Sequence, residues 1–407
     1  MAERKPVVLV GGQLQELPVG DTIPVGAVLP AGSSVGQVLK WNGTAWVAGT
    51  DETGGGGGGG LSPGDVLTTA RTLAAPNWLK CDGSVYLRSS YPAVEALLPT
   101  PPADGVTWTQ RTLPTSTNWR SVTYGNGVFV AVAGSSTIAA TSPDGVTWTQ
   151  RTLPTSDNWY SVTYGNGVFV AVAGSSSIAA TSPDGVTWTQ RTLPTSANWR
   201  SVTYGGGLFV AVAYGSTIAA TSPDGVTWTQ RTLPASDNWF SVTYGGGLFV
   251  AVAYGSSIAA TSPDGVTWTQ RTLPTSANWR SVTYGNGVFV AVAYGSIAAT
   301  SPDGITWTQR TLPTSGDWRS VTYGGGLFVA VAYGSNIAAT SPDGVTWTGR
   351  TLPTSTNWYS VTYGGGLFVA VAYSSTIAAT NSGDPTKFIV PQITDPALCR
   401  TYIKATT

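Results

Sequence analysis

Residues 199–233 read Trp-Arg-Ser-Val-Thr-Tyr-Gly-Gly-Gly-Leu-Phe-Val-Ala-Val-Ala-Tyr-Gly-Ser-Thr-Ile-Ala-Ala-Thr-Ser-Pro-Asp-Gly-Val-Thr-Trp-Thr-Gln-Arg-Thr-Leu. The same pattern recurs along most of the chain. Its Asp-Gly-Val-Thr-Trp core, or the Ile variant, begins at Asp104, Asp144, Asp184, Asp224, Asp264, Asp303 and Asp343. A fixed period of about 40 residues indicates one supersecondary unit per repeat.

Each repeat predicts four strands, which in the copy above are 199–204, 208–214, 217–221 and 226–233. The second strand is apolar throughout, as expected for a strand buried on both faces. The fourth alternates apolar and polar residues, which suits a half-exposed outer strand. Glycine-rich turns separate the strands. Four strands per 40 residues is typical of a β-propeller, so we expect an all-β fold with seven four-stranded blades.

The ends of the repeat array predict how the ring closes. The first copy begins at its fourth strand, 106–113, whereas the last copy stops after its third strand near Thr380. Pairing the two would complete the last blade and remove the free sheet edges that an open stack exposes. An open solenoid is the alternative.

The composition excludes several classes of function. Only 10% of the 407 residues are charged, the formal net charge is zero and histidine is absent. We therefore expect no nucleic-acid partner and no attraction to an anionic membrane. Without histidine, and with Cys81 and Cys399 as the two cysteines, we expect no zinc site, no other metal site and no cofactor. We favour buried free thiols over a disulfide between these cysteines, although a split module could bring them together.

The chain divides into five segments by composition. The N-terminal run before Gly11 is too short for a signal peptide, and no stretch is long enough to span a bilayer, so we expect folding in a cytoplasm. We expect strands at 7–10, within 38–46, at 388–391 and at 401–404, and a short helix at 91–98. The expected segments are 1–53, a polyglycine linker at 54–60, 61–103, the propeller at 104–381, and 382–407.

Two resemblances follow from these residues. The motif Ser-Pro-Asp-Gly-x-Thr-Trp resembles the Asp-box of sialidase-type propellers, Ser-x-Asp-x-Gly-x-x-Trp, with one residue missing between Asp and Gly. The flanks resemble tailed-bacteriophage fibre and appendage proteins and their tail-collar module. The matching segments are 5–21, Pro63-Gly-Asp-Val66, Trp78-Leu-Lys-Cys-Asp-Gly-Ser-Val-Tyr86, Ser89-Ser-Tyr-Pro-Ala93, Phe388-Ile-Val-Pro391 and Tyr402-Ile-Lys-Ala405.

The resemblance implies a small α+β collar-like module, 61–103 with 382–407, that is interrupted by the propeller. It also implies that 1–53 attaches the protein to other virion tail proteins. Insertion is physically reasonable because ring closure brings the two ends of the propeller together. Similar fibres are homo-oligomers, often trimers.

A glycosidase would need a pair of catalytic carboxylic acids, and the propeller does not offer glutamates for this role. Every glutamate lies outside it, at Glu3, Glu16, Glu52 and Glu95. Arginines recur at Arg111 and its equivalents in every repeat, which indicates a structural role. We therefore expect no catalytic residues and no enzymatic activity. The Asp-box carboxylates have a structural explanation too, since they can accept backbone N–H bonds in a turn while Gly takes positive φ and Trp packs between blades. These residues are Asp144, Asp184, Asp224, Asp264, Asp303 and Asp343.

The differences between repeats fall at three positions: before an Asn-Trp pair (Asp-Trp in one copy), after that pair, and after the second strand. All three positions lie in connections between strands: either between the fourth strand and the first strand of the next repeat, or between the second and third strands. In an antiparallel blade these two kinds of connection lie on the same face of the propeller, so all three positions share one face. Exposed aromatic and planar polar groups suit binding of a glycan or protein. We weigh this against drift in exposed loops, and expect Trp119 and its equivalents to be core residues. The candidate ligand-binding residues are Tyr160, Phe240, Tyr359, Arg120, Arg200, Arg280, Arg319, Asp157, Asp237, Tyr214, Tyr254, Tyr294, Tyr333 and Tyr373.

The sequence therefore predicts a bacteriophage virion tail fibre or appendage protein, assembled in the host cytoplasm, whose propeller binds a host-surface glycan or protein. A non-binding structural or decoration protein is the alternative. A polysaccharide depolymerase is less favoured because no carboxylate pair breaks the repeat pattern, and the flanks argue against a host-encoded lectin.

Overall fold

The computed structural model describes residues 103–381 in full and, outside that range, the backbone of nine short strands. Contacts divide the chain into two compact units, Met1–Leu98 with Val390–Thr407, and Pro99–Ile389. The described residues contain no helix that is long and apolar enough to cross a membrane. The expected linker at 54–60, the expected helix at 91–98, Cys81 and Cys399 lie outside the described residues.

Some of the nine short strands overlap the ranges in which the sequence predicts strands, and the others lie outside those ranges. The pairs β1–β2 and β3–β4 are antiparallel hairpins. Strand β26, which follows the repeats, pairs with β5 and with β6, which precede them. The chain on either side of the repeats thus contributes to one three-stranded sheet. The strands are β1 (Val7–Val10), β2 (Gln13–Glu16), β3 (Gln37–Trp41), β4 (Trp46–Thr50), β5 (Val66–Thr69), β6 (Trp78–Lys80), β7 (Val85–Leu87), β25 (Lys387–Ile389) and β26 (Arg400–Lys404).

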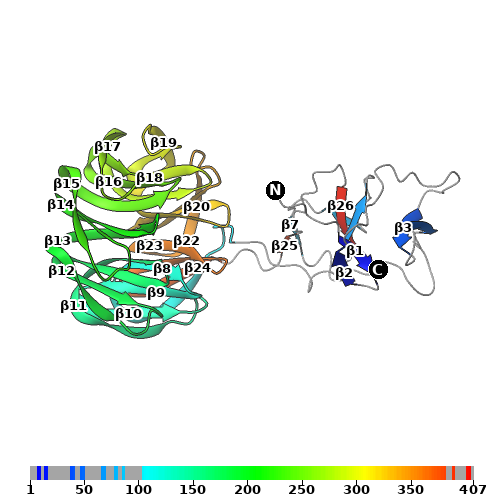
Figure 1. The fold of residues 1–407 in the computed structure, drawn as a ribbon, viewed down its shortest axis with the longest axis horizontal. Helices are drawn as coiled ribbons and strands as arrows, with labels where there is room; N and C mark the ends of the chain where they lie inside the picture. Colours follow the sequence, from blue (N-terminus) through cyan, green and yellow to red (C-terminus); the bar gives the residue numbers. More distant parts are fainter. Residues whose placement is uncertain are drawn as a thin grey trace. The chain divides into compact units, whose positions relative to one another are not determined.

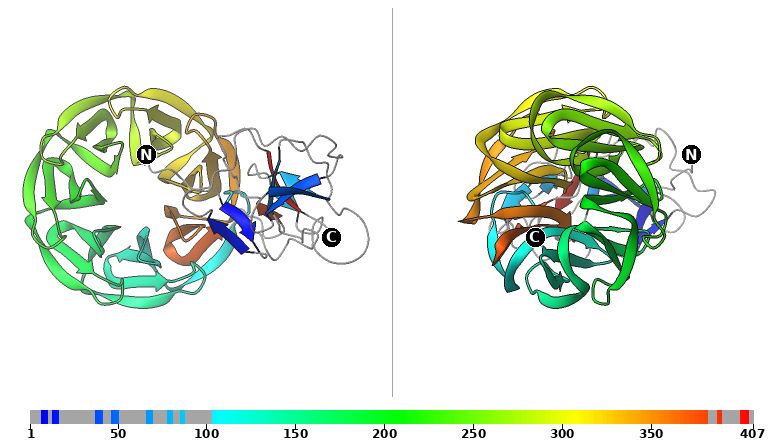
Figure 2. Two further views of the ribbon diagram at one scale, coloured as in Figure 1. Left: turned by 45° about the vertical axis from the view of Figure 1, so that its right-hand side comes forward. Right: turned by 90° about the vertical axis from the view of Figure 1, so that its left-hand side faces the viewer.

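The repeats form an all-β propeller that closes on itself (Figures 1 and 2). Its antiparallel strands follow one another around the ring in chain order, as the left view of Figure 2 shows from cyan to orange. The strands are β8 (Thr109–Gly125), β9 (Val128–Gly134), β10 (Ser136–Ser142), β11 (Thr149–Gly165), β12 (Val168–Ser182), β13 (Thr189–Gly205), β14 (Leu208–Ser222), β15 (Thr229–Gly245), β16 (Leu248–Ser262), β17 (Thr269–Gly285), β18 (Val288–Ser301), β19 (Thr308–Gly324), β20 (Leu327–Tyr333), β21 (Ser335–Ser341), β22 (Thr348–Thr356), β23 (Trp358–Gly364) and β24 (Leu367–Asn381).

The first and last repeats pair as expected. The start of β8 pairs with the end of β24, with Thr109 opposite Thr380 and Thr112 opposite Ile377. The open solenoid is therefore wrong. Closure leaves no open end of the repeat array at which a further repeat could pair.

Two details of the expected strands are wrong. The fourth strand begins three residues later than predicted, at Thr229, because the turn extends through Trp228. It then continues into the next first strand, and the second strand likewise continues into the third in most repeats. Pro194 lies inside β13, in the stretch where the ladder jumps from Thr192 to Ala197. A proline is tolerated at such an irregularity because no ladder hydrogen bond needs its missing N–H.

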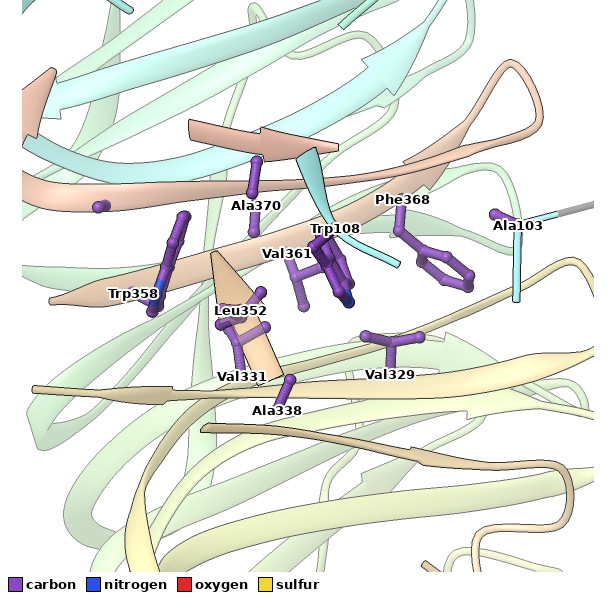
Figure 3. Packing of buried hydrophobic residues seen from close by; sticks show 12 residues of the cluster. Ala103, Trp108, Val329, Val331, Ala338, Leu352, Trp358, Val361, Phe368 and Ala370 are labelled. Atoms are coloured by element: carbon purple, nitrogen blue, oxygen red, sulfur yellow. The ribbon is translucent and has the colours of Figure 1, made fainter. Parts of the chain in front are cut away.

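The core lies between neighbouring repeats. Residues 103–381 contain seven buried clusters of closely similar composition, each drawn from two adjacent repeats. In the cluster of Figure 3, Trp358 and Phe368 of the last repeat pack with Val329 and Val331 of the repeat before it, and Trp108 comes from the first turn. Trp119 and its equivalents are fully buried, which confirms their assignment to the core.

Serine hydroxyls also link the innermost strands. The Oγ of Ser121 accepts a hydrogen bond from the backbone N–H of Val162 in the next repeat, at 3.1 Å. Ser360 closes the circle by accepting from Val122, at 3.2 Å. The same link joins every neighbouring pair of repeats between these two. The inner strands therefore form a circle that positions whatever side chains project toward the axis.

Candidate functional site: a ring of arginines and aromatics on the axis

The propeller has two faces that differ in variability. One face carries the turns that follow the first and third strands of each repeat. Two such turns are in contact where Asn166 Nδ2 donates a hydrogen bond to the Pro223 carbonyl at 3.3 Å. This face carries the Asp-boxes and barely changes between repeats, so we call it the Asp-box face. On the other, Asp157 pairs with Ser136 and Asn158 pairs with Gly174. This second face carries the three variable sets, and we call it the variable face.

Each Asp-box is a hydrogen-bonded turn. One carboxylate oxygen of Asp184 accepts the backbone N–H groups of Val186 and Thr187 at 2.8 and 3.0 Å, and the Ser182 hydroxyl at 3.0 Å. The Thr187 and Val186 bonds stabilise the charged carboxylate and hold the pKa of Asp184 below its ordinary value. The pKa is lowered in the same way at Asp144, Asp224, Asp264, Asp303 and Asp343. These bonds are sufficient to explain the carboxylates as turn-forming groups.

The Asp-box at the ring closure is assembled from the two ends of the array. Asn381 replaces the serine of the other boxes and is fully buried. Its Oδ1 accepts the Gly105 N–H at 2.8 Å, and its Nδ2 donates to the Asp104 carboxylate at 3.1 Å and to the Thr107 carbonyl at 2.7 Å. Three hydrogen bonds therefore join residues that are about 275 positions apart in the sequence.

The variable residue after each buried tryptophan occupies a β-bulge. In β11 the ladder passes from Trp159 to Ser161, so Tyr160 has no partner in the register. The same irregularity occurs after the tryptophan of every other repeat. A bulge reorients a side chain out of the strand's regular alternation.

All seven bulge residues line one cavity of about 90 Å³ on the axis. Ser320 and Ser360 of the serine circle also contribute to its lining. The structure thus brings together one complete set of the sequence-predicted candidates. They are Arg120, Tyr160, Arg200, Phe240, Arg280, Arg319 and Tyr359. We call them the axial ring.

Arginine and aromatic residues alternate around most of the axial ring. The Arg120 and Arg200 guanidinium carbons lie 4.3 and 4.0 Å from the centroid of the Tyr160 ring, and Arg200 also lies 5.1 Å from that of Phe240. Arg120 Nη1 donates a hydrogen bond to the Tyr359 hydroxyl at 3.2 Å. Stacking of a guanidinium on an aromatic face is attractive, and more so where water is partly excluded.

Alternation fails at one point, because a closed ring with seven positions cannot alternate throughout. Arg280 and Arg319 are therefore neighbours, and Asp317 lies between them. Its two carboxylate oxygens pair with Arg280 Nε at 3.1 Å and Arg319 Nε at 2.9 Å. Burial, and after it the charge of Arg319, lower the pKa of Arg280, while Asp317 acts in the opposite direction. Asp317 replaces the asparagine that precedes the buried tryptophan in the other repeats, and it supplies the one carboxylate that these two cations share.

The other half of the axial ring has no such carboxylate. Within residues 103–381, the donors Arg120 Nε, Arg200 Nε and Arg200 Nη1 are buried and have no hydrogen-bond partner, and the acceptor Asn198 Oδ1 is buried and unpaired as well. Buried donors are normally satisfied, and a charged donor without an acceptor is costly. On the Asp317 side of the axial ring one carboxylate is thus shared by two cations, whereas the Arg120–Arg200 side has unsatisfied cationic donors.

A second set of candidates lies beside the axial ring, at the ends of the second strands. Tyr254 lies 5.8 Å from Phe240, and Tyr373 is stacked on Tyr359 at 5.6 Å. Tyr214 and Tyr333 make edge contacts with the same two aromatics, at 6.4 Å each. Tyr294 stands apart because its side chain is 56% exposed, in the repeat that has lost one residue.

Two repeats have glycine where the others have this tyrosine, and the reason is steric. A Cβ at Gly134 would lie 2.3 Å from Arg120 Nε, and one at Gly174 would lie 2.3 Å from Tyr160 Cε2. The absence of a side chain therefore allows Arg120 and Tyr160 to fold against the backbone. The residue after the tryptophan and the residue after the second strand belong to separate variable sets in the sequence. In these two repeats the identity of one restricts the identity of the other.

The remaining candidates are not part of the cavity. Asp157 and Asp237 each accept a hydrogen bond from the next backbone N–H, at 2.6 Å, and do not line it. Arg151 and its equivalents donate from Nε to a threonine hydroxyl of the adjacent strand, for example Thr141 at 2.9 Å. Asp317 was not predicted as a site residue. It could have been found from the sequence, because the one Asp-Trp pair occurs where two consecutive repeats both have arginine after the tryptophan.

The fold has several solved counterparts. Virginiamycin B lyase from Staphylococcus aureus is similar with a TM-score of 0.62 at 14% identity, covering 67% of this chain and 98% of that chain. YCF48 bound to D1 peptide is similar with a TM-score of 0.57 at 19% identity, covering 71% and 99%. No protein-family model and no curated protein matches the chain. At these identities the likeness shows the β-propeller fold alone.

One expectation is corrected by this comparison. The absence of a carboxylate pair led us to expect no enzymatic activity, yet similar propellers include lyases, one of them the streptogramin B lyase at a TM-score of 0.62 and 13% identity. That expectation assumed glycoside hydrolysis as the only chemistry for such a ring. A propeller of this shape is compatible with other chemistries, so the argument from missing glutamates does not hold.

Proposed function

We propose that this chain is a bacteriophage virion tail fibre or appendage protein whose propeller binds a host-surface receptor through the variable face. One observation carries the binding proposal. One of the three variable sets lines a single axial cavity, where its members contact one another, and tyrosines of a second set pack beside it. Independent drift in solvent-exposed loops would not be expected to produce a ring with complementary contacts and one compensating aspartate.

The virion assignment rests on the flanks. The sheet formed by β26 with β5 and β6 joins chain segments from both sides of the repeats, which is the arrangement that an interrupted collar-like module requires. We propose that residues 61–103 and 382–407 form this module. Residues 1–53 would attach the protein to other virion tail proteins, and the chain would assemble as a homo-oligomer in the host cytoplasm before residing in the virion.

We also propose that the propeller has seven four-stranded blades. Seven buried clusters and seven serine-to-backbone links around the axis support this number. There are fewer than four separate strands per blade because many strands continue unbroken through two consecutive strand positions of the repeat pattern, as β13 and β14 do. Class averages of the purified protein viewed down the axis would reveal the blade number directly.

The receptor is a glycan or a protein. YCF48, whose fold is similar, has been solved bound to a D1 peptide. The competing proposal is a decoration protein whose propeller adds bulk without binding. The aromatic and arginine content of the axial ring favours binding over this alternative.

The test is binding of the purified chain to whole bacteria and to an array of bacterial surface glycans. A variant with Tyr160→Ala, Phe240→Ala and Tyr359→Ala removes the aromatics of the axial ring. The matched control changes three exposed residues of the Asp-box face, with Val146→Ala, Val226→Ala and Ile305→Ala. Circular dichroism and thermal melting of each variant would establish that it is folded.

Saturable binding that is lost in the axial variant and kept in the control would support a receptor-binding variable face. Unchanged binding in both variants would place the receptor contact elsewhere, and equal loss in both would reject a contact specific to the variable face. No binding of the folded wild-type protein to any surface would favour the decoration protein. Glycan products would be analysed alongside, because shortened glycans would add a catalytic step to binding.

A further inference from the structure

The Arg120–Arg200 side of the axial ring has the properties of an anion site. Arg120 and Arg200 lie over the Tyr160 ring and line the cavity, and three of their buried nitrogens have no acceptor within residues 103–381. Arg280 and Arg319 provide the internal comparison, because Asp317 satisfies them with short ion pairs. The protein itself thus shows the group that completes a pair of ring arginines: a carboxylate.

We propose that this side of the axial ring binds the carboxylate of an acidic sugar, of the uronic acid type, within a host-surface glycan. The proposal deepens the receptor-binding function above and rests on it for the source of the ligand. Tyr160 separates Arg120 from Arg200, so a bound carboxylate would contact one of these two guanidiniums directly and supply the kind of negative charge that Asp317 gives to Arg280 and Arg319. Charge-assisted hydrogen bonds to a guanidinium are among the strongest that proteins make with such groups.

The size and walls of the cavity decide which oxyanion fits. Its volume of about 90 Å³ is enough to admit a carboxylate group. The walls on this side are flat, formed by the Tyr160 and Phe240 rings and the two guanidiniums. Flat walls favour a planar carboxylate over a tetrahedral phosphate or sulfate.

The surroundings of the cavity favour a saccharide over an acidic peptide. Once the carboxylate is seated, the rest of the ligand extends past Tyr373 and Tyr214, whose ring centroids lie 5.1 Å from the Arg120 and 5.2 Å from the Arg200 guanidinium carbon. These side chains are half-buried and present aromatic surface beside polar hydroxyls. Aromatic faces bind the apolar C–H faces of sugar rings, and hydroxyls can pair with sugar hydroxyls.

The experiment is calorimetric titration of the full chain with methyl glucuronide, and with methyl glucoside as the neutral ligand of the same shape. Acetate, inorganic phosphate and a glutamate-containing peptide form further arms. The variants are Arg200→Gln and Arg120→Gln, with Arg231→Gln as a charge-matched control, since Arg231 donates to Thr221 on an outer strand and does not line the cavity. Melting temperatures of all variants would be measured first.

We expect methyl glucuronide to bind, methyl glucoside to bind at least tenfold more weakly, and Arg200→Gln or Arg120→Gln to weaken glucuronide binding at least tenfold. Arg231→Gln should change that affinity less than twofold. Arg200→Lys keeps the charge, and a partial recovery of affinity would identify loss of charge rather than of shape. Higher salt should weaken binding, because the interaction is charge-assisted.

Three results would overturn the proposal. The first is no glucuronide binding by the folded protein, and the second is tighter binding of phosphate or of the acidic peptide than of glucuronide. The third is unchanged affinity in both folded arginine variants. The two proposals fail separately. Binding to bacteria that glucuronide does not compete with would reject the carboxylate site alone, and glucuronide binding without any attachment to cells would reject receptor binding alone.

Discussion

Asp317→Asn tests whether the break in arginine–aromatic alternation is held by one carboxylate. Asparagine occupies the equivalent position in the other repeats, as at Asn278, so the change is compatible with the backbone. The side chains of Asp317, Arg280 and Arg319 are only 16%, 11% and 16% exposed, so the two ion pairs are poorly screened by solvent. The substitution removes the charge while keeping the shape.

The magnitude follows from these contacts. Each hydrogen bond to a charged group contributes about 1.5–3 kcal/mol, and an asparagine oxygen can keep part of one. Removing one partner of a well-buried pair costs about 3–5 kcal/mol, and partial exposure lowers this. We therefore expect a loss of about 3 kcal/mol in the free energy of unfolding, with a fall in melting temperature of about 6 °C for a domain of this size.

The assay is chemical denaturation and calorimetry of four proteins: wild type, Asp317→Asn, Arg319→Tyr and the double variant. Tyrosine occupies the position of Arg319 in two other repeats, as Tyr160 and Tyr359, so Arg319→Tyr separates the adjacent cations with an aromatic. We expect the double variant to recover at least half of the stability that Asp317→Asn loses. A loss below about 1 kcal/mol, or equal effects of Asp317→Asn in both backgrounds, would refute the argument.

Three further predictions follow from the ring closure, the turns and the glycine positions. Asn381→Ala should lower the free energy of unfolding by about 2–4 kcal/mol, because three buried bonds are lost, and Asn381→Ser should lose less; denaturant titration measures both. The six Asp-box carboxylates with lowered pKa stabilise the fold fully above their unfolded pKa, so stability should fall as pH drops below about 4. Melting curves from pH 6 to 2 would show this, with a shallower fall in Asp224→Asn. Gly174→Ala should cost about 1–3 kcal/mol by displacing Tyr160 and the Asn198 side chain, whose Oδ1 would lie 2.7 Å from the new Cβ, and adding Tyr160→Ala should remove part of that cost.

The repeat period and the apolar pattern of one copy were enough to predict the β-propeller and its closure. Both depend on features that every repeat shares, such as the buried second strand and the fully buried Trp199. The strand ends were less predictable. Pro194 suggests a break, but the ladder around it is irregular, so the strand continues through it. Periodicity reports the shared environment of a position and gives little information about local register.

The axial ring was predicted only as a set of separate positions. The sequence indicates that the residue after each tryptophan varies and lies on one face, but the bulge that turns it toward the axis has no sequence signature of its own. The coupling between Gly174 and Tyr160 is likewise a matter of a few ångströms, since a Cβ at Gly174 would lie 2.3 Å from Tyr160 Cε2. Differences between repeats therefore located the site, whereas its chemistry required the three-dimensional arrangement.

The asymmetry of the axial ring is a consequence of closing an odd number of near-identical units. Alternating cations and aromatics around seven positions leaves one adjacent pair of the same kind, which here is Arg280 and Arg319. One substitution, asparagine to Asp317, compensates that pair and leaves Arg120 and Arg200 as the cations without a carboxylate. A ring built by duplication thereby acquires one distinct side without any change in its backbone. If an acidic ligand binds there, it would contact the Arg120–Arg200 side in preference to the rest of the ring, so the stoichiometry of binding should be one ligand per chain.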